Sequence, residues 1–170
     1  MSLFSRTADL PGLQGTLRDC TTGGKGYSRL RAGDIAVINT PDITRQEDQR
    51  LLDAKPAAIL NLSQFSTGAV PNFGPHMLLE PGTLLVENVG AEIGTALKDG
   101  KKGRVTEDGV LHVGDREIGG GTVVTPMSAE LTFVEAQQSL VDRMEAFFGN
   151  TIQFIHQEGP LLIDGLGIPD

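Results

Sequence analysis

Residues 29–39, RLRAGDIAVIN, contain the segment that decides the fold of this 170-residue chain. A Gly-Asp pair, typical of a turn, comes directly before four consecutive apolar residues, Ile35 to Ile38. A short, unbroken apolar run bounded by turn residues is typical of a strand that is buried on both faces. Similar short apolar runs occur at residues 57–62, AAILNL, and at residues 83–89, TLLVENV. We therefore expect a buried sheet that contains these three strands.

Helical segments separate the predicted strands. Residues 43–54 place Ile43, Leu51 and Leu52 among charged residues, and Lys55-Pro56 ends the segment. Shorter helices are expected around residues 73–79 and 93–97. Residues 98–124 then alternate Asp-Gly and Gly-Asp turns with short apolar runs, which is typical of β-hairpins. The order predicts an α/β core over residues 29–125, flanked by a small hairpin-rich β layer.

The two ends of the chain differ from this core. Residues 1–28 are rich in Gly, Thr and Ser, and we interpret them as an extended arm with one short strand at most. Residues 126–158 instead repeat apolar side chains with helical period. We expect this helix to end at Gly159-Pro160, with a candidate kink at Gly149-Asn150, and residues 159–170 to form a linker toward a second domain.

The predicted long helix is amphipathic along its whole length. Two neighbouring columns of apolar side chains repeat every seven residues, and a helix of this length would extend about 50 Å, which exceeds what a small domain can cover. We predict that it forms an interface with a second copy, giving a homodimer, or with a partner's helix. The alternative is that it packs on its own domain or on the missing second domain. The predicted interface residues are Phe133, Leu140, Met144, Phe147, Ile152 and Phe154.

Composition limits the partners and the compartment. A formal net charge of −8 argues against a nucleic-acid partner, because a phosphate backbone would be repelled. The single cysteine, Cys20, cannot form an internal disulfide, so we expect a cytoplasmic protein. The N-terminus has no signal-peptide pattern, and no apolar stretch is long enough to insert into a membrane.

Patterns that carry catalytic chemistry are weak in this sequence. The glycine-rich segment near Lys101 lacks the form of a phosphate-binding loop, and no serine stands in a nucleophile elbow. His76, His112 and His156 are far apart and do not have metal-ligand spacing, so we expect no metal site. We predict a non-catalytic fragment that needs no cofactor.

The loop at residues 61–75, NLSQFSTGAVPNFGP, is the best candidate for a ligand or partner site. It follows a predicted buried strand, and ligands of open α/β folds dock at that edge of the sheet. Its hydroxyl, amide and backbone groups are suited to bind a small polar molecule. The alternative is a purely structural crossover into the next helix, which we favour. The candidate residues are Asn61, Ser63, Ser66, Gly68, Asn72 and Gly74.

Four ordered blocks of the chain resemble one known family. LRAGDIAVIN, NLSQFSTGAVPNFGP, TLLVENVG and the terminal LLIDGLGIPD are similar to actinobacterial SteA-like proteins of the cytokinetic ring. The resemblance implies a role in septation and cell separation at the division site, with the membrane-associated partner SteB. It also implies a following domain that resembles thiamine pyrophosphokinase.

A second resemblance concerns the fold. The order of predicted elements is similar to the swivelling β/β/α phosphohistidine domain of phosphoenolpyruvate-utilising enzymes. The phosphocarrier histidine of those domains would fall near Phe73 here, and His76 stands about one helical turn further on. The resemblance therefore implies the fold without its phosphotransfer chemistry.

Together these observations predict a scaffold module of a cell-division protein that assembles through its long helix. The alternative is a ligand-binding or enzymatic domain that acts with a thiamine pyrophosphokinase-like second domain on a nucleotide or a phosphorylated small molecule.

Overall fold

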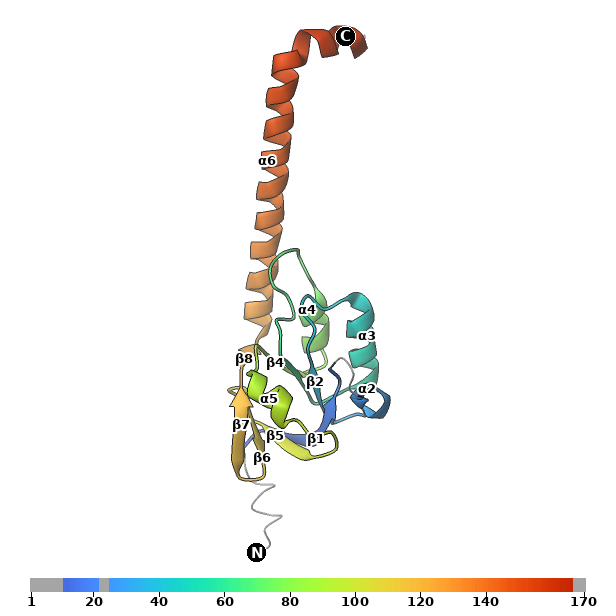
Figure 1. The fold of residues 1–170 in the computed structure, drawn as a ribbon, viewed down its shortest axis with the longest axis vertical. Coiled ribbons are helices and arrows are strands. Elements are labelled where there is room, and N and C mark those ends of the chain that lie inside the picture. The colour runs from blue at the N-terminus through green and yellow to red at the C-terminus, as the bar shows by residue number, and fades with distance from the viewer. Residues whose placement is uncertain (1–10, 22–24, 167–170) are drawn as a thin grey trace, which may run out of the picture.

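The computed structural model describes residues 11–21 and 25–166, with side chains as far as residue 149. It shows a mixed α/β domain from which one long helix extends (Figure 1). The strands are β1 (Leu13–Asp19), β2 (Ile35–Ile38), β3 (Ala58–Asn61), β4 (Leu84–Glu87), β5 (Lys102–Val105), β6 (Val110–Val113), β7 (Arg116–Gly120) and β8 (Thr122–Val124). The helices are α2 (Gly26–Arg29), α3 (Arg45–Ala54), α4 (Gly74–Leu79), α5 (Ala91–Ala96) and α6 (Pro126–Leu166).

The eight described strands form one sheet in the order β7-β6-β5-β1-β2-β3-β4-β8. Strands β1 to β4 are parallel, and β5, β6, β7 and β8 pair with their neighbours in antiparallel orientation. The predicted buried strands and the helices that separate them are confirmed. The structure thus shows the α/β class and the hairpins that follow the α/β core.

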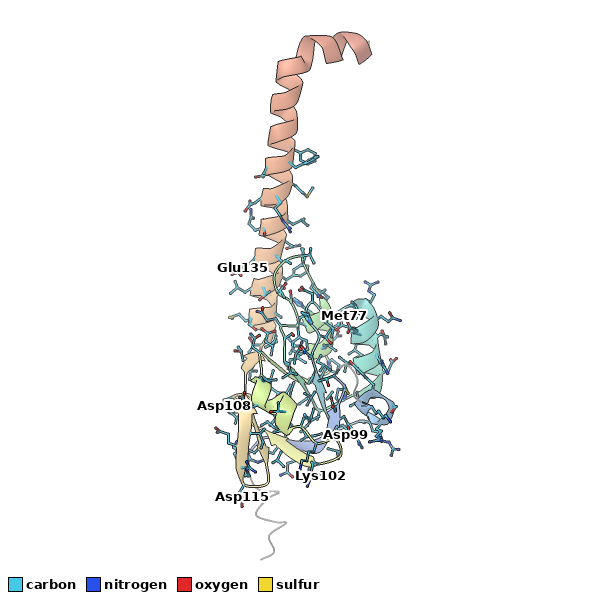
Figure 2. The ribbon with its side chains drawn as sticks, viewed as in Figure 1. Met77, Asp99, Lys102, Asp108, Asp115 and Glu135 are labelled. Atoms are coloured by element: carbon cyan, nitrogen blue, oxygen red, sulfur yellow. The ribbon has the colours of Figure 1, made fainter. Side chains whose placement is uncertain are left out.

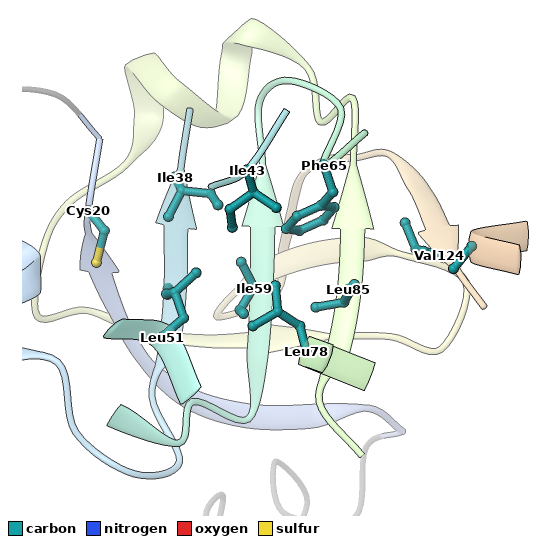
Figure 3. Close-up of a cluster of buried hydrophobic side chains, with 11 residues drawn as sticks. Cys20, Ile38, Ile43, Leu51, Ile59, Phe65, Leu78, Leu85 and Val124 are labelled. Carbon is teal, nitrogen blue, oxygen red and sulfur yellow. The ribbon is translucent and has the colours of Figure 1, made fainter. Parts of the chain in front are cut away.

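Burial on both faces explains the unbroken apolar runs. Successive side chains of a strand point to opposite faces of the sheet. In β2, Ala36 and Ile38 pack with Leu51 of α3 and Leu78 of α4 in one apolar cluster (Figure 3). On the other face Ile35 and Val37 pack in a second cluster that contains Ile93 of α5 together with β5 and β6 residues. The parallel strands are therefore covered by helices on one face and by the hairpin strands and α5 on the other.

Local chemistry determines where α3 begins and ends. The side chain of Thr44 accepts a hydrogen bond from the backbone N–H of Glu47, and the Glu47 carboxylate accepts one from the N–H of Thr44. This reciprocal capping box satisfies two N–H groups that a helix start leaves without partners. Lys55 ends the helix in the left-handed conformation, with φ of 55°. The helix predicted over residues 43–54 therefore begins two residues later, at Arg45, because the cap stands at Thr44.

Residues 13–19 form the one short strand that the interpretation of residues 1–28 as an extended arm allowed, but this strand is not peripheral. Strand β1 lies inside the sheet, parallel to β2 and antiparallel to β5. The segment LQGTLRD has few strand-forming residues, but its neighbours on both sides provide the hydrogen bonds that keep it extended. Cys20 follows directly and is buried, so it does not lie in a flexible arm. Residues 1–10 and 22–24 of the predicted arm lie outside the described residues.

The end of the long helix also differs from the prediction. Helix α6 runs through Gly149-Asn150 and past Gly159-Pro160, ending at Leu166. Its ribbon bends in the last part of the helix, coloured red in Figure 1. Proline in a helix interior removes one backbone hydrogen bond, which kinks a helix without always ending it. The predicted linker at residues 159–170 is thus helical at least as far as Leu166, and residues 167–170 lie outside the described residues.

Candidate functional site

The 61–75 loop begins at the carboxyl end of β3, where Asn61 is fully buried. Its side-chain oxygen accepts hydrogen bonds of 3.0 Å from the N–H groups of Thr40 and Ser63, and its amide donates to the carbonyl of Thr40 at 3.0 Å. The hydroxyl of Ser63 in turn donates to the side chain of Asn39 at 2.6 Å. These two candidate residues therefore hold the loops that follow β2 and β3 together.

The far end of the loop is also built from internal contacts. The Asn72 amide donates to the carbonyl of Ile43, and its oxygen accepts from the N–H of Gly74 at 2.8 Å. A Cβ at Gly74 would lie 2.6 Å from a carboxylate oxygen of Asp48, so only glycine fits beside α3. Gly68 has a φ of +85°, which favours glycine at the loop tip. Asn72, Gly68 and Gly74 thus serve the structural crossover that we favoured.

Ser66 differs from the other polar candidate residues of the loop, because its hydroxyl makes no hydrogen bond that holds the loop in place. It is 7% exposed, and its buried hydroxyl has no hydrogen-bond partner. It lines a cavity of about 70 Å³ that also contains Glu87, at the carboxyl end of β4, and Thr132 of α6. Burial raises the pKa of Glu87, while a hydrogen bond from the backbone N–H of Phe65 lowers it, and the net direction is upward. The cavity is far smaller than the roughly 300 Å³ or more of ordinary ligand sites.

A larger cavity lies at the opposite edge of the parallel strands. It has a volume of about 460 Å³ and is lined mainly by apolar residues of α3, α4 and the segments that lead into β3 and β4. Lys55 is the charged residue in its lining. None of our candidate residues lies in this cavity, because we chose them for their position near the carboxyl ends of the parallel strands. Among the residues that the structure describes, the lining of this cavity contains no cluster of polar side chains that would indicate a particular ligand.

The first turns of α6 are docked on the domain. The ring of Phe133 contacts the rings of Phe73 and His76 edge-on, with centroids 5.7 and 5.6 Å away, and these two rings stack at 4.2 Å. Nε2 of His76 lies 2.9 Å from a carboxylate oxygen of Glu130. We call this group, Phe73, His76, Glu130 and Phe133, the aromatic latch. Phe133 of the predicted interface therefore packs on its own domain, and its partners are 57 or more positions away in sequence, so the sequence offered no signal for this contact.

Above the aromatic latch, one more contact joins the helix to the domain. The guanidinium of Arg143 donates to the carbonyl of Ala69 in the 61–75 loop at 2.8 Å. Figure 1 shows this loop rising beside α6, after which the helix continues without the domain next to it. We call residues 144–166 the projecting part of α6. At about 1.5 Å per residue it is about 34 Å long.

Large apolar side chains stay exposed where α6 leaves the domain. The exposed fractions are 38% for Leu140, 43% for Val141, 49% for Met144, 66% for Phe147 and 54% for Phe148. Figure 2 shows the side chains of α6 standing out from the ribbon in this region. The candidate residues Leu140, Met144 and Phe147 are thus on the surface of this chain. The side chains of Ile152 and Phe154 lie outside the described residues.

These side chains share one face of the helix. With about 100° of rotation per residue, Leu140, Val141, Met144, Phe147 and Phe148 lie within an arc of about 120°. Arcs of this width are typical of helices that pack against a core. Asp142 and Glu145 lie outside the arc. The region is therefore an amphipathic helix whose apolar face is exposed to the extent of 38–66% per side chain.

Reactive and charged groups elsewhere have structural surroundings. Burial raises the pKa of the Cys20 thiol to about 12, with a smaller contribution from the charges of Asp19 and Asp99, so it is a poor nucleophile. Asp99 contacts Arg29 at 2.9 Å and Arg18 at 3.4 Å, and it accepts from the N–H of Asp19. Burial acts to raise the pKa of Asp99, but these contacts hold it below its ordinary value. The group fastens the loop before β5 onto the end of β1.

No group of three or more His, Cys, Asp or Glu residues among the described residues has an arrangement that could hold a metal ion. No helix in the described ranges is long and apolar enough to cross a membrane.

In comparisons with known proteins, no family model, no curated protein and no solved structure matches this chain. Its class follows from the structure alone. The chain is an α/β domain with one mixed eight-stranded sheet, continued by a long amphipathic helix of which the base is docked and the rest projects.

Proposed function

We propose that this chain is a non-catalytic assembly module that pairs with a second copy of itself through the projecting part of α6 and the turn before it. One observation carries the proposal. The apolar face formed by Leu140, Val141, Met144, Phe147 and Phe148 is exposed at 38–66% per side chain, although each of these residues is large. Contiguous apolar patches of this kind are typical of interaction sites.

Burial of this face provides the driving force. Moving a Leu, Met or Phe side chain fully out of water contributes about 1.5–3 kcal/mol. The five side chains carry no charge, and the cores of protein interfaces are depleted in charged residues. A helix laid along the apolar arc would bury all five residues together. A helix with an equivalent arc is present in every copy of the chain, so self-pairing needs no further component.

The cellular role is part of the proposal. The likeness of four sequence blocks to SteA-like proteins supports a place in septation and cell separation, at the cytoplasmic side of the division site, with SteB as the membrane-associated partner. The order of the elements supports a swivelling β/β/α fold in the same way. Co-localisation of a fluorescent fusion with the division septum, and its loss when SteB is removed, is the expected result in a host that carries the protein.

The direct test is the solution mass of the chain. We expect a dimer by light scattering, and a monomer after the double substitution Leu140→Asp and Phe147→Asp, because a buried unpaired carboxylate costs several kcal/mol. The matched control is Leu131→Asp, an exposed apolar residue of the same helix that points away from the arc. We expect the control to remain a dimer.

The result that contradicts the proposal is equally clear. If the wild-type chain has the mass of a monomer at every concentration, it does not pair with itself. If a dimer survives the double substitution, the dimer does not form through the apolar arc. Circular dichroism should show that the double variant keeps its fold, since both substituted residues lie on the surface of the single chain.

A further inference from the structure

We propose that a cavity between α5 and the hairpin strands binds a small organic phosphate, a molecule that joins a charged phosphate group to an apolar body. The cavity has a volume of about 310 Å³, and ligand pockets usually measure about 300–1,000 Å³. Its lining comes from β1, the end of α5, the turn before β5, and the strands β6 and β7. These elements are distinct from the 61–75 loop and from α6, so the proposal does not depend on self-pairing.

A tight turn supplies two lysines to the lining. The carbonyl of Lys98 accepts a hydrogen bond from the N–H of Lys101 at 3.2 Å, and Gly100 takes the left-handed conformation with φ of +91°. The turn is fastened to β1, because the N–H of Leu17 donates to the carbonyl of Lys101 at 2.7 Å and the carbonyl of Leu17 accepts from Gly100 at 2.8 Å. The backbone therefore fixes both lysines beside the cavity.

The acid of this turn is bound elsewhere. Asp99 lies between the two lysines in sequence, but its carboxylate contacts Arg29 at 2.9 Å and Arg18 at 3.4 Å, and it accepts a hydrogen bond from the N–H of Asp19. Asp99 is thus held toward the end of β1 and α2. The lysines on either side of it keep their charges without neutralisation by this carboxylate.

Arg116 adds a third positive charge at the start of β7, where it pairs with Val113 of β6. Successive side chains of a strand point to opposite faces, so Glu117 points away from the side that Arg116 and Ile118 share. Among the described residues, the two lysines and Arg116 form no ion pair, and no acidic residue belongs to the lining. The cavity is therefore locally positive in a chain with a formal net charge of −8.

The floor of the cavity is apolar. Leu17 is 2% exposed, and Val113 and Ile118 are partly buried against the same apolar cluster. Figure 1 shows α5, whose last residue Ala96 completes the lining, next to the hairpin strands. An apolar floor beside three cations is complementary to a ligand that has an anionic end and an apolar body.

The number of cations favours phosphate over carboxylate as the anionic end. A phosphate monoester carries a charge of about −1.5 to −2 at neutral pH on three acceptor oxygens, whereas a carboxylate carries one charge on two oxygens. A guanidinium binds two phosphate oxygens at once, and lysine binds phosphate as a point charge. The negative charge of the chain as a whole repels a long polyanion, so the ligand is a small molecule.

Binding of 1-naphthyl phosphate to the 170-residue chain, measured by isothermal titration calorimetry, tests the proposal. Inorganic phosphate and 1-naphthol are probes of each half alone, and we expect each to bind about tenfold more weakly or worse. Lys101→Gln should weaken the binding of 1-naphthyl phosphate about tenfold, because it removes one charged contact. Lys102→Gln is the matched control and should change the dissociation constant less than about twofold, since only screened charge is lost. The Lys102 ammonium donates to the hydroxyl of Thr16 at 3.0 Å, outside the lining.

The position of the ligand provides the second readout. Amide signals of residues 98–101 and 113–118 should shift in NMR spectra when 1-naphthyl phosphate is added, and those of residues 140–149 should not. Both substituted lysines are exposed, so the melting temperature should not change in either variant.

Three results would overturn the proposal: no binding, equal weakening by the two lysine substitutions, or shifts confined to α6. None of them bears on self-pairing, which the solution mass tests separately.

Discussion

At the scale of single residues, the most unusual group is the carboxyl of Asp48 in α3. It is 1% exposed, and one of its oxygens is buried without a hydrogen-bond partner. Burial raises its pKa to about 7, and the neighbouring charge of Glu47 acts in the same direction. The carboxyl lies against Gly74 and Ile43, at the contact between α3 and the start of α4. Folding therefore favours the protonated form of this acid.

The sign of the pH dependence follows. Below about pH 4, the ordinary pKa of an aspartate, Asp48 is protonated in both the folded and the unfolded chain. Between about pH 4 and 7, Asp48 ionises in the unfolded chain but stays protonated in the folded chain. The free energy of unfolding should fall as pH rises through this range, by up to about 4 kcal/mol. Asp48→Asn should raise the melting temperature at pH 8 and flatten this fall, as measured by thermal denaturation. Asp53→Asn, an exposed acid of the same helix, is the control and should change little. Equal slopes for wild type and Asp48→Asn would mean that Asp48 is not the group responsible.

At the scale of elements, the aromatic latch joins α6 to α4. Phe73, His76 and Phe133 come from a loop, a helix of six residues and the long helix, and Glu130 adds a polar contact to His76. In this arrangement the His76 ring contacts both aromatic rings, and its Nδ1 is buried without a hydrogen-bond partner. His76, which we compared with the phosphocarrier histidine of swivelling domains, is therefore part of a packing contact.

Removing the centre of the aromatic latch should loosen the base of α6. Phe133→Ala loses the ring contacts with Phe73 and His76, and we expect a cost of about 2 kcal/mol, less than for a fully buried ring. Hydrogen exchange of residues 129–143 should accelerate more than exchange in β2 and β3. Met127→Ala, which removes an 81% exposed side chain in the first turn, should leave exchange unchanged. Uniform acceleration over the whole domain would instead place Phe133 in the global core.

At the scale of the whole molecule, stability and assembly are linked. A second copy that binds only the folded helix stabilises it by mass action, so the melting temperature should rise with protein concentration. Above the dissociation constant, each tenfold increase in protein concentration adds about 1.4 kcal/mol per dimer, or about 0.7 kcal/mol per chain. The double variant Leu140→Asp and Phe147→Asp should melt at one temperature over the same range. Differential scanning fluorimetry at several concentrations measures both, and a wild type without this dependence would speak against the dimer.

The sequence by itself determined the elements that depend on local pattern. Apolar runs bounded by turns predicted β2, β3 and β4, because strands buried on both faces need apolar residues at every position. The seven-residue columns predicted α6 and its apolar arc, because the helical period is a local property. The loop residues Asn61 and Asn72 were recognised as polar groups at the edge of the sheet, but their partners were not recognisable.

Only the tertiary structure decided the rest. It placed β1 inside the sheet, although LQGTLRD is a weak strand former, because pairing with β2 and β5 supplies hydrogen bonds that no local pattern encodes. It directed the amides of Asn61 and Asn72 into the protein. It also divided one continuous apolar face of α6 into a base packed on α4 and a part that projects. That division depends on where a loop and a helix more than 50 residues earlier come to lie, which the period of the helix does not contain.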